Sequence, residues 1–397
     1  IMTFPNETLP KGRKQKTTAL YDRFVSMGAV MGDSFGLESV LWFADNPTDA
    51  YEEPTIKRSR SHEYVSKEVK NVRENVGVIE VANFSKHEFQ GPDARNFLDY
   101  VLAGRIPKPG RICLNPMLTP KGKLYGDLTV ACLNENRFII FGSGAVQEMH
   151  RRWFESHLKD FNVVYKNRSD DFHGLALSGP KSRELLQKLV RENISNENFK
   201  FRDVKEMYVA GVPAIVNRIS FTGELGYEIY VAPQFLLKLF EEMELVGKEF
   251  GLKPFGGRAL MSMRLEKNWG AWTLDYRPDF TAKESSLDVF INWNKEFIGK
   301  ESAKKDNSSL KLTPLIVETD DIDVCNNEAV MKDGKSIGYV TSGGFAHYVN
   351  KSIAFSYLDK NILNSDKKIQ VEINGNFFNC LIIKEPLYDP SGKKMRN

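Results

Sequence analysis

The sequence carries an aspartate inside a strand-like stretch, where carboxylates are uncommon. Asp127 stands in Lys121-Gly-Lys-Leu-Tyr-Gly-Asp-Leu-Thr-Val-Ala131. Because successive side chains of a strand point to opposite faces, Tyr125, Asp127 and Thr129 share one face. Aspartate is depleted in strands, so its place between a tyrosine and a threonine indicates a polar cavity. The alternative is an aspartate on a solvent-facing sheet surface.

A second acidic residue, Glu228, follows the turn-forming residues 222–226, Thr-Gly-Glu-Leu-Gly. Alternation along the next strand places Glu228 and Tyr230 on one face and Tyr227 on the other. A carboxylate accepts two parallel N–H donors. Glu228 would therefore suit a heterocycle that presents an adjacent ring N–H and amino group, as a pterin does. A surface glutamate on an edge strand is the alternative.

One basic residue has a special position, because Arg258 directly follows Gly256-Gly257 at the start of a predicted helix over residues 258–267. A planar guanidinium binds a carboxylate with two hydrogen bonds. Cations are disfavoured at a helix N-terminus, which gives this arginine a reason to bind an acidic ligand. The alternative is a solvated helix residue.

Composition and absent motifs exclude several classes of protein. The chain has 397 residues, 41% hydrophobic and 27% charged, with a formal net charge of +3. Such a balance is typical of a globular protein and lacks the basic excess of nucleic-acid-binding proteins. No apolar run approaches the roughly 18 residues of a membrane helix. The six histidines and four cysteines form no metal-binding spacing, and there is no dinucleotide, P-loop or GxSxG motif. We therefore expect no nucleic acid, no membrane and no metal.

The four cysteines are widely separated, which suits buried thiols in a reducing compartment. No signal peptide is visible, so the sequence predicts a cytoplasmic protein. The first residue is Ile1 rather than a methionine. Either Ile1 is an added residue before Met2, or the chain continues a longer polypeptide.

An internal repeat predicts how the acidic residues are positioned. Residues 88–102 and 176–190 each read as a short strand, a Gly-Pro and an amphipathic helix. Paired strands are predicted after each one, over 126–133 and 137–142 in the first half and over 214–221 and 227–231 in the second. This β-α-β-β recurrence predicts two ferredoxin-like α+β halves. From about residue 310 onward, short strands separated by turns predict a small β-barrel. The predicted boundaries are an N-terminal extension over 1–60, an α+β region over 61–300 and the barrel over 301–397.

The motifs, taken in order, resemble the folate-binding aminomethyltransferase family, which is typified by the glycine-cleavage T-protein. Within that family the chain is most similar to the C-terminal half of dimethylglycine and sarcosine dehydrogenases. The stretches that carry the resemblance are Val76–Val81, Gly126–Val130, Leu177–Ser182, Phe221–Tyr230, Arg258–Glu266 and Ile337–Gly343, and those typical of the dehydrogenase branch are Leu20–Phe24, Met117–Gly122 and Glu385–Arg396.

The resemblance implies a three-part cloverleaf, in which two interleaved ferredoxin-like α+β domains enclose a central folate pocket and a C-terminal β-barrel closes it. It implies tetrahydrofolate as cofactor, Asp127 as the catalytic residue and Glu228 as the residue that holds the pterin. The other cofactor-binding residues that we expect are Tyr230, Arg258, Tyr125 and Tyr227. As partners it implies a small methylated donor and a flavin dehydrogenase domain or subunit. We expect a monomer or a weak oligomer.

The function that we expect is transfer of a methylene or methyl group from a methylated amine, such as dimethylglycine or sarcosine, to tetrahydrofolate. One alternative is a folate-dependent demethylase that takes a methyl group from sulfur, oxygen or nitrogen without a flavin. Another is a non-catalytic folate-binding accessory protein. Relatives of that kind carry a cysteine-containing motif, and the corresponding stretch here, Arg264–Trp269, has no cysteine.

Overall fold

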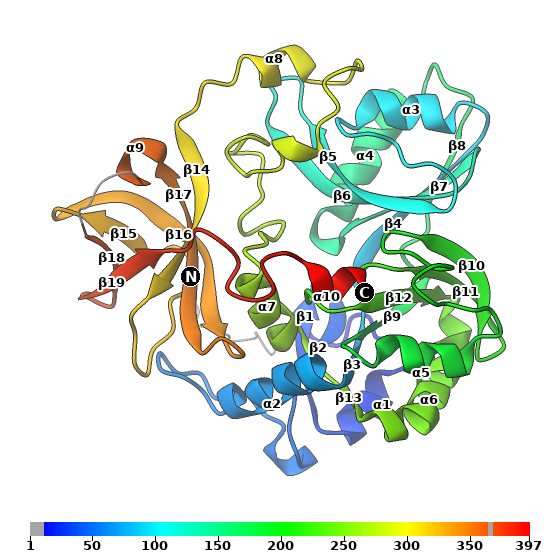
Figure 1. The fold of residues 1–397 in the computed structure, drawn as a ribbon, viewed down its shortest axis with the longest axis horizontal. Helices are drawn as coiled ribbons and strands as arrows, with labels where there is room; N and C mark the ends of the chain where they lie inside the picture. The colour runs from blue at the N-terminus through cyan, green and yellow to red at the C-terminus, as the bar shows by residue number, and fades with distance from the viewer. Residues whose placement is uncertain (1–11, 364–367) are drawn as a thin grey trace.

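A six-stranded sheet, a five-stranded sheet and a closed barrel form the three lobes of the computed structural model, which describes residues 12–363 and 368–397 (Figure 1). Two sheets, antiparallel except for the parallel pair β3 and β13, carry helices on their outer faces, and with the separate barrel they make an α+β cloverleaf. The predicted fold class is confirmed.

The five-stranded sheet is ferredoxin-like with one extra strand. Strands and helices alternate as β4-α3-β6-β7-α4-β8, and β5 pairs with β6 at the edge. The helices bury Phe97 and Phe154 against Phe89 and Phe138 of the sheet. In sheet order the strands are β5 (Arg111–Leu118), β6 (Leu124–Asn134), β7 (Arg137–Ser143), β4 (Phe84–Gln90) and β8 (Val164–Asn167), and the helices are α3 (Ala94–Val101) and α4 (Gln147–His157).

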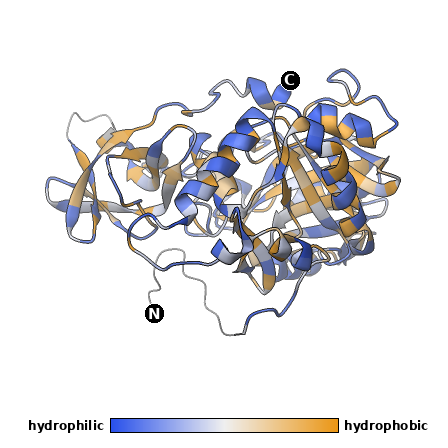
Figure 2. Cartoon of the chain, turned by 90° about the horizontal axis from the view of Figure 1, so that it is seen from below, coloured by the Kyte–Doolittle hydropathy of each residue, from blue (hydrophilic) through white to orange (hydrophobic). Residues whose placement is uncertain are grey.

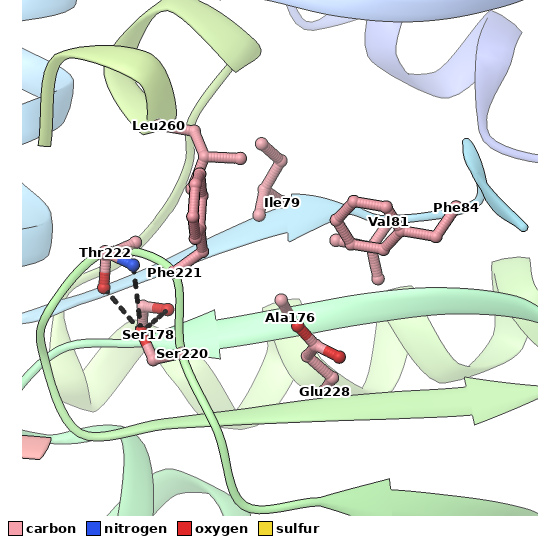
Figure 3. A pocket seen from close by; sticks show the side chains of 10 residues that line it. All are labelled: Ile79, Val81, Phe84, Ala176, Ser178, Ser220, Phe221, Thr222, Glu228 and Leu260. Carbon is pink, nitrogen blue, oxygen red and sulfur yellow. Dashed lines mark hydrogen bonds between the residues drawn. The ribbon is translucent and has the colours of Figure 1, made fainter. Parts of the chain in front are cut away.

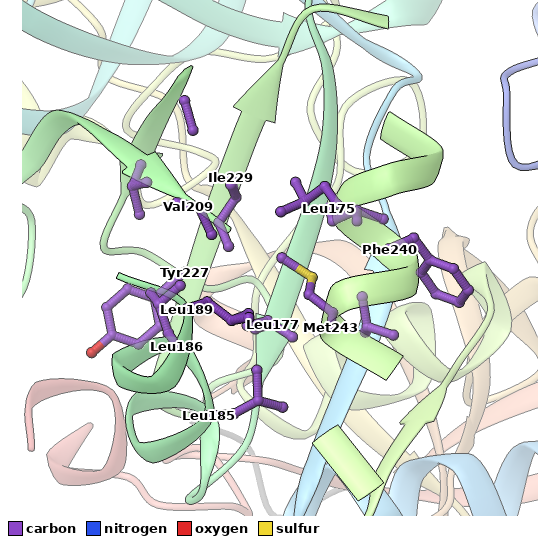
Figure 4. Packing of buried hydrophobic residues seen from close by; sticks show 14 of the residues in the cluster. Leu175, Leu177, Leu185, Leu186, Leu189, Val209, Tyr227, Ile229, Phe240 and Met243 are labelled. Carbon is purple, nitrogen blue, oxygen red and sulfur yellow. The ribbon is translucent and has the colours of Figure 1, made fainter. Parts of the chain in front are cut away.

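The six-stranded sheet contains the second half of the repeat. Its outer face packs on two helices, and Figure 4 shows Leu177 and Ile229 of the sheet close to Met243 of α6. In sheet order the strands are β10 (Val204–Val209), β11 (Val212–Asn217), β12 (Gly226–Val231), β9 (His173–Ser178), β3 (Val76–Glu80) and β13 (Leu252–Pro254), and the helices are α5 (Ser182–Leu189) and α6 (Leu236–Gly247). Strand β3 precedes the first half in the chain but lies between β9 and β13, so the two halves are interleaved.

Each repeat depends on a glycine before its helix. Gly91 and Gly179 have φ of +148° and +135°, a conformation that other residues rarely adopt. A Cβ atom would lie 2.4 Å from a backbone oxygen at both positions, that of Asn162 in the first and that of Asn75 in the second. The Gly-Pro of the sequence repeat thus occupies a tight turn that only glycine permits.

The N-terminal part packs into the core of the α+β region. It comprises α1 (Tyr21–Ser26), the hairpin β1 (Ala29–Ser34) and β2 (Leu37–Phe43), and α2 (Ser61–Glu74). Leu20 and Trp42 have no exposed surface. The described part of the predicted extension is therefore an integral part of the fold, and residues 1–11 lie outside the described residues. Hydrophobic residues concentrate in the strands, and the helices turn hydrophilic residues outward (Figure 2).

The C-terminal lobe is a closed six-stranded barrel, as the turn spacing predicts. Helix α7 (Gly257–Glu266) contacts α2, β2 and the barrel strand β16, so it joins the lobes. In barrel order the strands are β14 (Leu310–Val317), β17 (Lys351–Asp359), β16 (Lys335–Ala346), β15 (Ala329–Lys332), β18 (Ile369–Ile373) and β19 (Asn376–Ile382), and the short helices are α8 (Lys300–Lys304), α9 (Lys360–Leu363) and α10 (Lys393–Arg396). Within residues 12–363 and 368–397, no helix combines the length and the apolar character that crossing a membrane requires.

Candidate functional site

The two sheets of the α+β region face one another across a buried layer. This layer contains Ile215 and Tyr230 from the six-stranded sheet and Ile139 and Phe141 from the five-stranded sheet. The rings of Phe141 and Tyr230 stack with centroids 4.6 Å apart. Side chains that share a face with these residues therefore point into the space between the sheets.

Asp127 lies on this inward face of β6. Thr129 pairs with Phe141 across β6 and β7, and Asp127 is two residues from Thr129, so all three share a face. Asp127 is half-buried, and burial raises the pKa of its carboxyl to about 7. Among the described side chains, none forms a hydrogen bond or an ion pair with it. An unpaired carboxyl with a pKa near neutrality suits proton transfer.

Glu228 lies on the inward face of β12, opposite the five-stranded sheet. The hydroxyl of Tyr230 donates a hydrogen bond of 2.9 Å to Oε2 of Glu228. Burial raises the pKa of Glu228 to about 7, whereas the Tyr230 hydroxyl, the Asn217 side chain and the positive charge of Lys86 oppose this rise. The two carboxyls thus occupy the facing surfaces of two sheets, and each titrates near neutral pH.

A recess opens beside Glu228 (Figure 3). Its cavity volume is about 10 Å³, about the space of one water molecule, and the surrounding empty space of about 290 Å³ includes open solvent. Asp127 does not line it. The lining residues come from β3, β4, β9, β12, α7 and the loop before β12: Ile79, Val81, Phe84, Ala176, Ser178, Ser220, Phe221, Thr222, Glu228 and Leu260.

One wall of the recess is a loop that follows strand β11, and β11 ends earlier than the sequence predicts. The apolar pattern predicts a strand over residues 214–221, but β11 stops at Asn217. After Asn217, side-chain oxygens accept hydrogen bonds from backbone N–H groups. Ser220 Oγ accepts from Thr222 N at 3.2 Å, and Thr222 Oγ1 accepts from Glu224 N at 3.2 Å. Such local bonds compete with strand pairing and leave Phe221 free to line the recess.

A buried arginine fixes this loop to the rest of the fold. Arg73 of α2 donates to the backbone oxygen of Thr222 at 2.7 Å and to Glu224 at 2.9 Å. Its other terminal nitrogen pairs with Glu266 of α7 at 2.6 Å. The ring of Tyr388 covers its guanidinium at 3.7 Å, and the Tyr388 hydroxyl bonds to Glu224. The wall of the recess is thus anchored to two helices and to the C-terminal segment.

The residues around Glu228 fit a flat ligand that carries several hydrogen-bonding groups. Asn217 of β11 pairs directly with Glu228 across the strands, so both side chains share the inward face. The Asn217 carboxamide is fully buried and favours the ionised form of Glu228, yet neither its nitrogen nor its oxygen has a partner in good hydrogen-bonding geometry. Buried polar groups are normally satisfied. An acceptor carboxylate beside an unsatisfied amide matches the donor and acceptor edge of a pterin.

Three of the predicted site residues lie elsewhere. Tyr227 is on the outer face of β12, where Arg183 donates to its hydroxyl at 3.2 Å. Arg258 is paired with Glu52 at 2.9 Å and donates to Ser61 at 2.7 Å. The structure therefore separates Tyr227 from Glu228 and engages Arg258 with residues of the N-terminal part.

The ring of Tyr125 packs on Trp153 of α4, with centroids 4.6 Å apart. Its backbone oxygen bonds to His150 at 2.8 Å. Although alternation predicts a shared face with Asp127, Tyr125 is the extra residue at a register shift between β5 and β6, because Leu118 pairs with Leu124 and Met117 with Gly126. The ring is consequently directed to the helix layer.

The sequence did not single out three other residues near the carboxyls, namely Lys86, Asn217 and Tyr276. Lys86 has no exposed surface and lies on the inward face of β4. Burial raises the pKa of Tyr276, and the charge of Asp127 adds to the rise. A polar run inside a strand, Ser85-Lys-His-Glu88, was the signal that could have identified Lys86. Within the described part of the chain, no group of three histidine, cysteine or acidic side chains could hold a metal ion.

Two family models match this chain, one over the α+β region and one over the barrel. Residues 20–295 match the GCVT N-terminal domain, and residues 311–389 match the glycine cleavage T-protein C-terminal barrel domain. Among solved structures, glycine cleavage system aminomethyltransferase T from Bartonella henselae has a TM-score of 0.82 at 20% identity. That likeness covers 95% of this chain and 99% of the other, and it shows a common fold.

Some relatives are about twice as long as this chain, and others are of similar length. The chain is 34% identical over 396 residues to mitochondrial dimethylglycine dehydrogenase of Homo sapiens, which is 98% of this chain and 46% of that relative. The chain thus spans less than half of that protein. It is 29% identical over 383 residues to an aminomethyltransferase of Desulfitobacterium hafniense (strain Y51), with 95% of this chain and 99% of that relative covered.

Proposed function

Since the chain belongs to the glycine cleavage T-protein family of folate-dependent aminomethyltransferases, we propose that it transfers a one-carbon unit from an N-methylated amine to tetrahydrofolate. The donor that we propose is of the dimethylglycine or sarcosine kind. Similarity along 98% of the chain to dimethylglycine dehydrogenase supports this donor class. The single observation that carries the proposal is the pair of inward-facing carboxyls on facing sheets, the half-buried Asp127 and the buried Glu228.

Tetrahydrofolate is the cofactor of this family, and its nitrogens supply the nucleophile that takes up the one-carbon unit. We propose that Glu228 holds the pterin edge through Oε1, since Oε2 already accepts the hydroxyl of Tyr230. Asn217 offers an unsatisfied amide beside it. Phe221 and Leu260 provide apolar walls for a flat ring.

Asp127 has the properties of the proton acceptor. Its carboxyl has no described side-chain partner, and its pKa of about 7 keeps about half of it ionised at neutral pH. A base whose pKa lies near the working pH is ionised to a large extent and still has enough proton affinity to accept a proton in the reaction. We propose that Asp127 accepts the proton released at the nucleophilic nitrogen and later returns it to the departing amine. General-base assistance of this kind contributes about 10²–10⁴-fold to a rate.

Isotope tracing tests the proposal. The chain is incubated with tetrahydrofolate and N-(¹³C-methyl) dimethylglycine, with and without a flavin amine dehydrogenase that oxidises the methyl carbon by two electrons. We expect ¹³C in methylene-tetrahydrofolate, only when the dehydrogenase is present, and faster than without the chain. Labelled methyl-tetrahydrofolate formed without any oxidant would favour a direct demethylase. No labelled folate above the rate without the chain would contradict the proposed activity.

A further inference from the structure

A lysine is buried next to the carboxyl that we assign to the pterin. Lys86 of β4 has no exposed surface. Its ammonium donates to the backbone oxygens of Ala82 at 2.9 Å and Ser169 at 3.4 Å. It also lies 5.8 Å from the centroid of the Tyr230 ring, within the range at which a cation is attracted to an aromatic face. Lys86 is thus held in place by backbone oxygens, without a direct carboxylate partner among the described residues.

The tyrosine joins this lysine to Glu228. Its ring faces Lys86, and its hydroxyl donates to Glu228 at 2.9 Å. A positive charge and a hydrogen-bond donor both favour the ionised form of a nearby carboxyl. Only the ionised form offers two acceptor oxygens, because a protonated carboxyl carries a donor on one of them.

We propose that Lys86 is a positioning residue that favours the ionised form of Glu228, the form able to accept the donor edge of a pterin, by acting across Tyr230. The assignment of the ligand rests on the proposed function. The electrostatic link between Lys86 and Glu228 does not, since it is a property of the protein alone.

Other charged groups face Lys86 from the elements packed around it. Glu80 ends β3, His173 begins β9, and Asp170 lies in the loop before β9, paired with Lys16 of the N-terminal segment. Burial lowers the pKa of Lys86 to about 7, against the opposing effects of Asp170, Glu80 and Glu228. Burial also raises the pKa of Glu80 to about 7 and lowers that of His173 to about 4. Glu228 itself is faced by Tyr230, Asn217 and Lys86.

The test measures the titration of Glu228 without any ligand. The protein is labelled with ¹³C at the glutamate carboxyl carbons, and the Glu228 resonance is identified by its loss in Glu228→Gln. In Lys86→Met we expect the midpoint of this titration to rise by about one pH unit, as for loss of a partly screened charge in the protein interior. The control is Lys159→Met, which removes an exposed lysine just beyond α4 and should leave the midpoint unchanged. An unchanged midpoint in folded Lys86→Met would overturn the proposal.

A reciprocal measurement decides the matter if Lys86→Met does not fold. Coupling between two sites is mutual, so the ¹³Cε titration of Lys86 should move to lower pH in Glu228→Gln by the same amount. No movement there would equally overturn the proposal.

Calorimetric titration with tetrahydrofolate then tests the consequence for binding. Affinity should increase as pH rises through the Glu228 midpoint, and this increase should occur at higher pH in Lys86→Met. An affinity profile that is identical in the two proteins would refute the role of Lys86 in binding. If the parent binds no tetrahydrofolate at any pH while the carboxyl titrations still shift, the proposed function fails and the electrostatic link stands.

Discussion

Replacing Asp127 by asparagine should stabilise the protein at high pH. Burial raises the pKa of this carboxyl from 3.8 to about 7, so the folded state favours the protonated form, whereas the unfolded chain ionises near the ordinary value. Stability is therefore lost as pH rises from the unfolded to the folded pKa. The rise of about 3 pH units corresponds to at most about 4 kcal/mol, at 1.36 kcal/mol per unit.

Asparagine cannot ionise, so Asp127→Asn removes this pH-dependent cost. At pH 5.5 the parent protein has already lost part of this free energy of unfolding, and at pH 8.5 it has lost nearly all of it. The stability advantage of the variant should therefore grow by about 2 kcal/mol between these two pH values, as measured by urea unfolding. Asp160→Asn is the control, because Asp160 is exposed and its variant should follow the parent at both pH values. A stability advantage of Asp127→Asn that does not change with pH would contradict this expectation and show that the carboxyl is not desolvated in the folded protein.

Three further substitutions have defined outcomes. Glu228→Ala should weaken binding of tetrahydrofolate by about tenfold or more in calorimetric titration, since a charge-assisted bond contributes about 1.5–3 kcal/mol; equal affinity would rule out the pterin assignment. Arg73→Met should lower the free energy of unfolding in urea by about 3–5 kcal/mol, because it leaves the buried Glu224 and Glu266 uncompensated; a loss below about 1 kcal/mol would mean that solvent reaches the network. Tyr230→Phe removes the donor to Glu228 and should raise the pH at which Glu228 titrates in ¹³C spectra; an unchanged titration would show that the hydroxyl does not stabilise the ionised carboxyl.

Local pattern was sufficient to predict the architecture and the faces of the key strands. Alternation correctly placed Glu228 and Tyr230 together, because a strand with one buried face fixes the direction of every side chain. The Gly-Pro repeat correctly predicted two related halves, since its glycines occupy turns that other residues cannot adopt. A turn at every short interval after residue 310 likewise indicated the barrel.

Contacts between distant segments could not be predicted in this way. Arg258 follows two glycines at a helix start, which suggested a free ligand-binding arginine, but its partners Glu52 and Ser61 come from the N-terminal part nearly 200 residues away. The buried position of Lys86 depends on how the two sheets pack, and no spacing within β4 encodes that packing. The register shift that turns Tyr125 toward α4 is equally a property of the pairing with β5.

The position of β3 in the six-stranded sheet also depends on contacts between distant segments. Its sequence predicts a strand, and the structure confirms it. Its neighbours β9 and β13 lie about 100 and 170 residues further along the chain. Interleaving of the halves was therefore implied by the family resemblance and not by any local signal.

In the reaction that we propose, Glu228 holds the ligand and Asp127 moves the proton. The most direct measurement compares Asp127→Asn with the parent in two assays: calorimetric binding of tetrahydrofolate, and single-turnover transfer of a ¹³C-labelled methyl carbon oxidised by a flavin dehydrogenase. We expect nearly unchanged binding and a transfer rate that falls by about 10²–10⁴-fold. Transfer at the parental rate, or binding lost together with transfer, would contradict this assignment of roles.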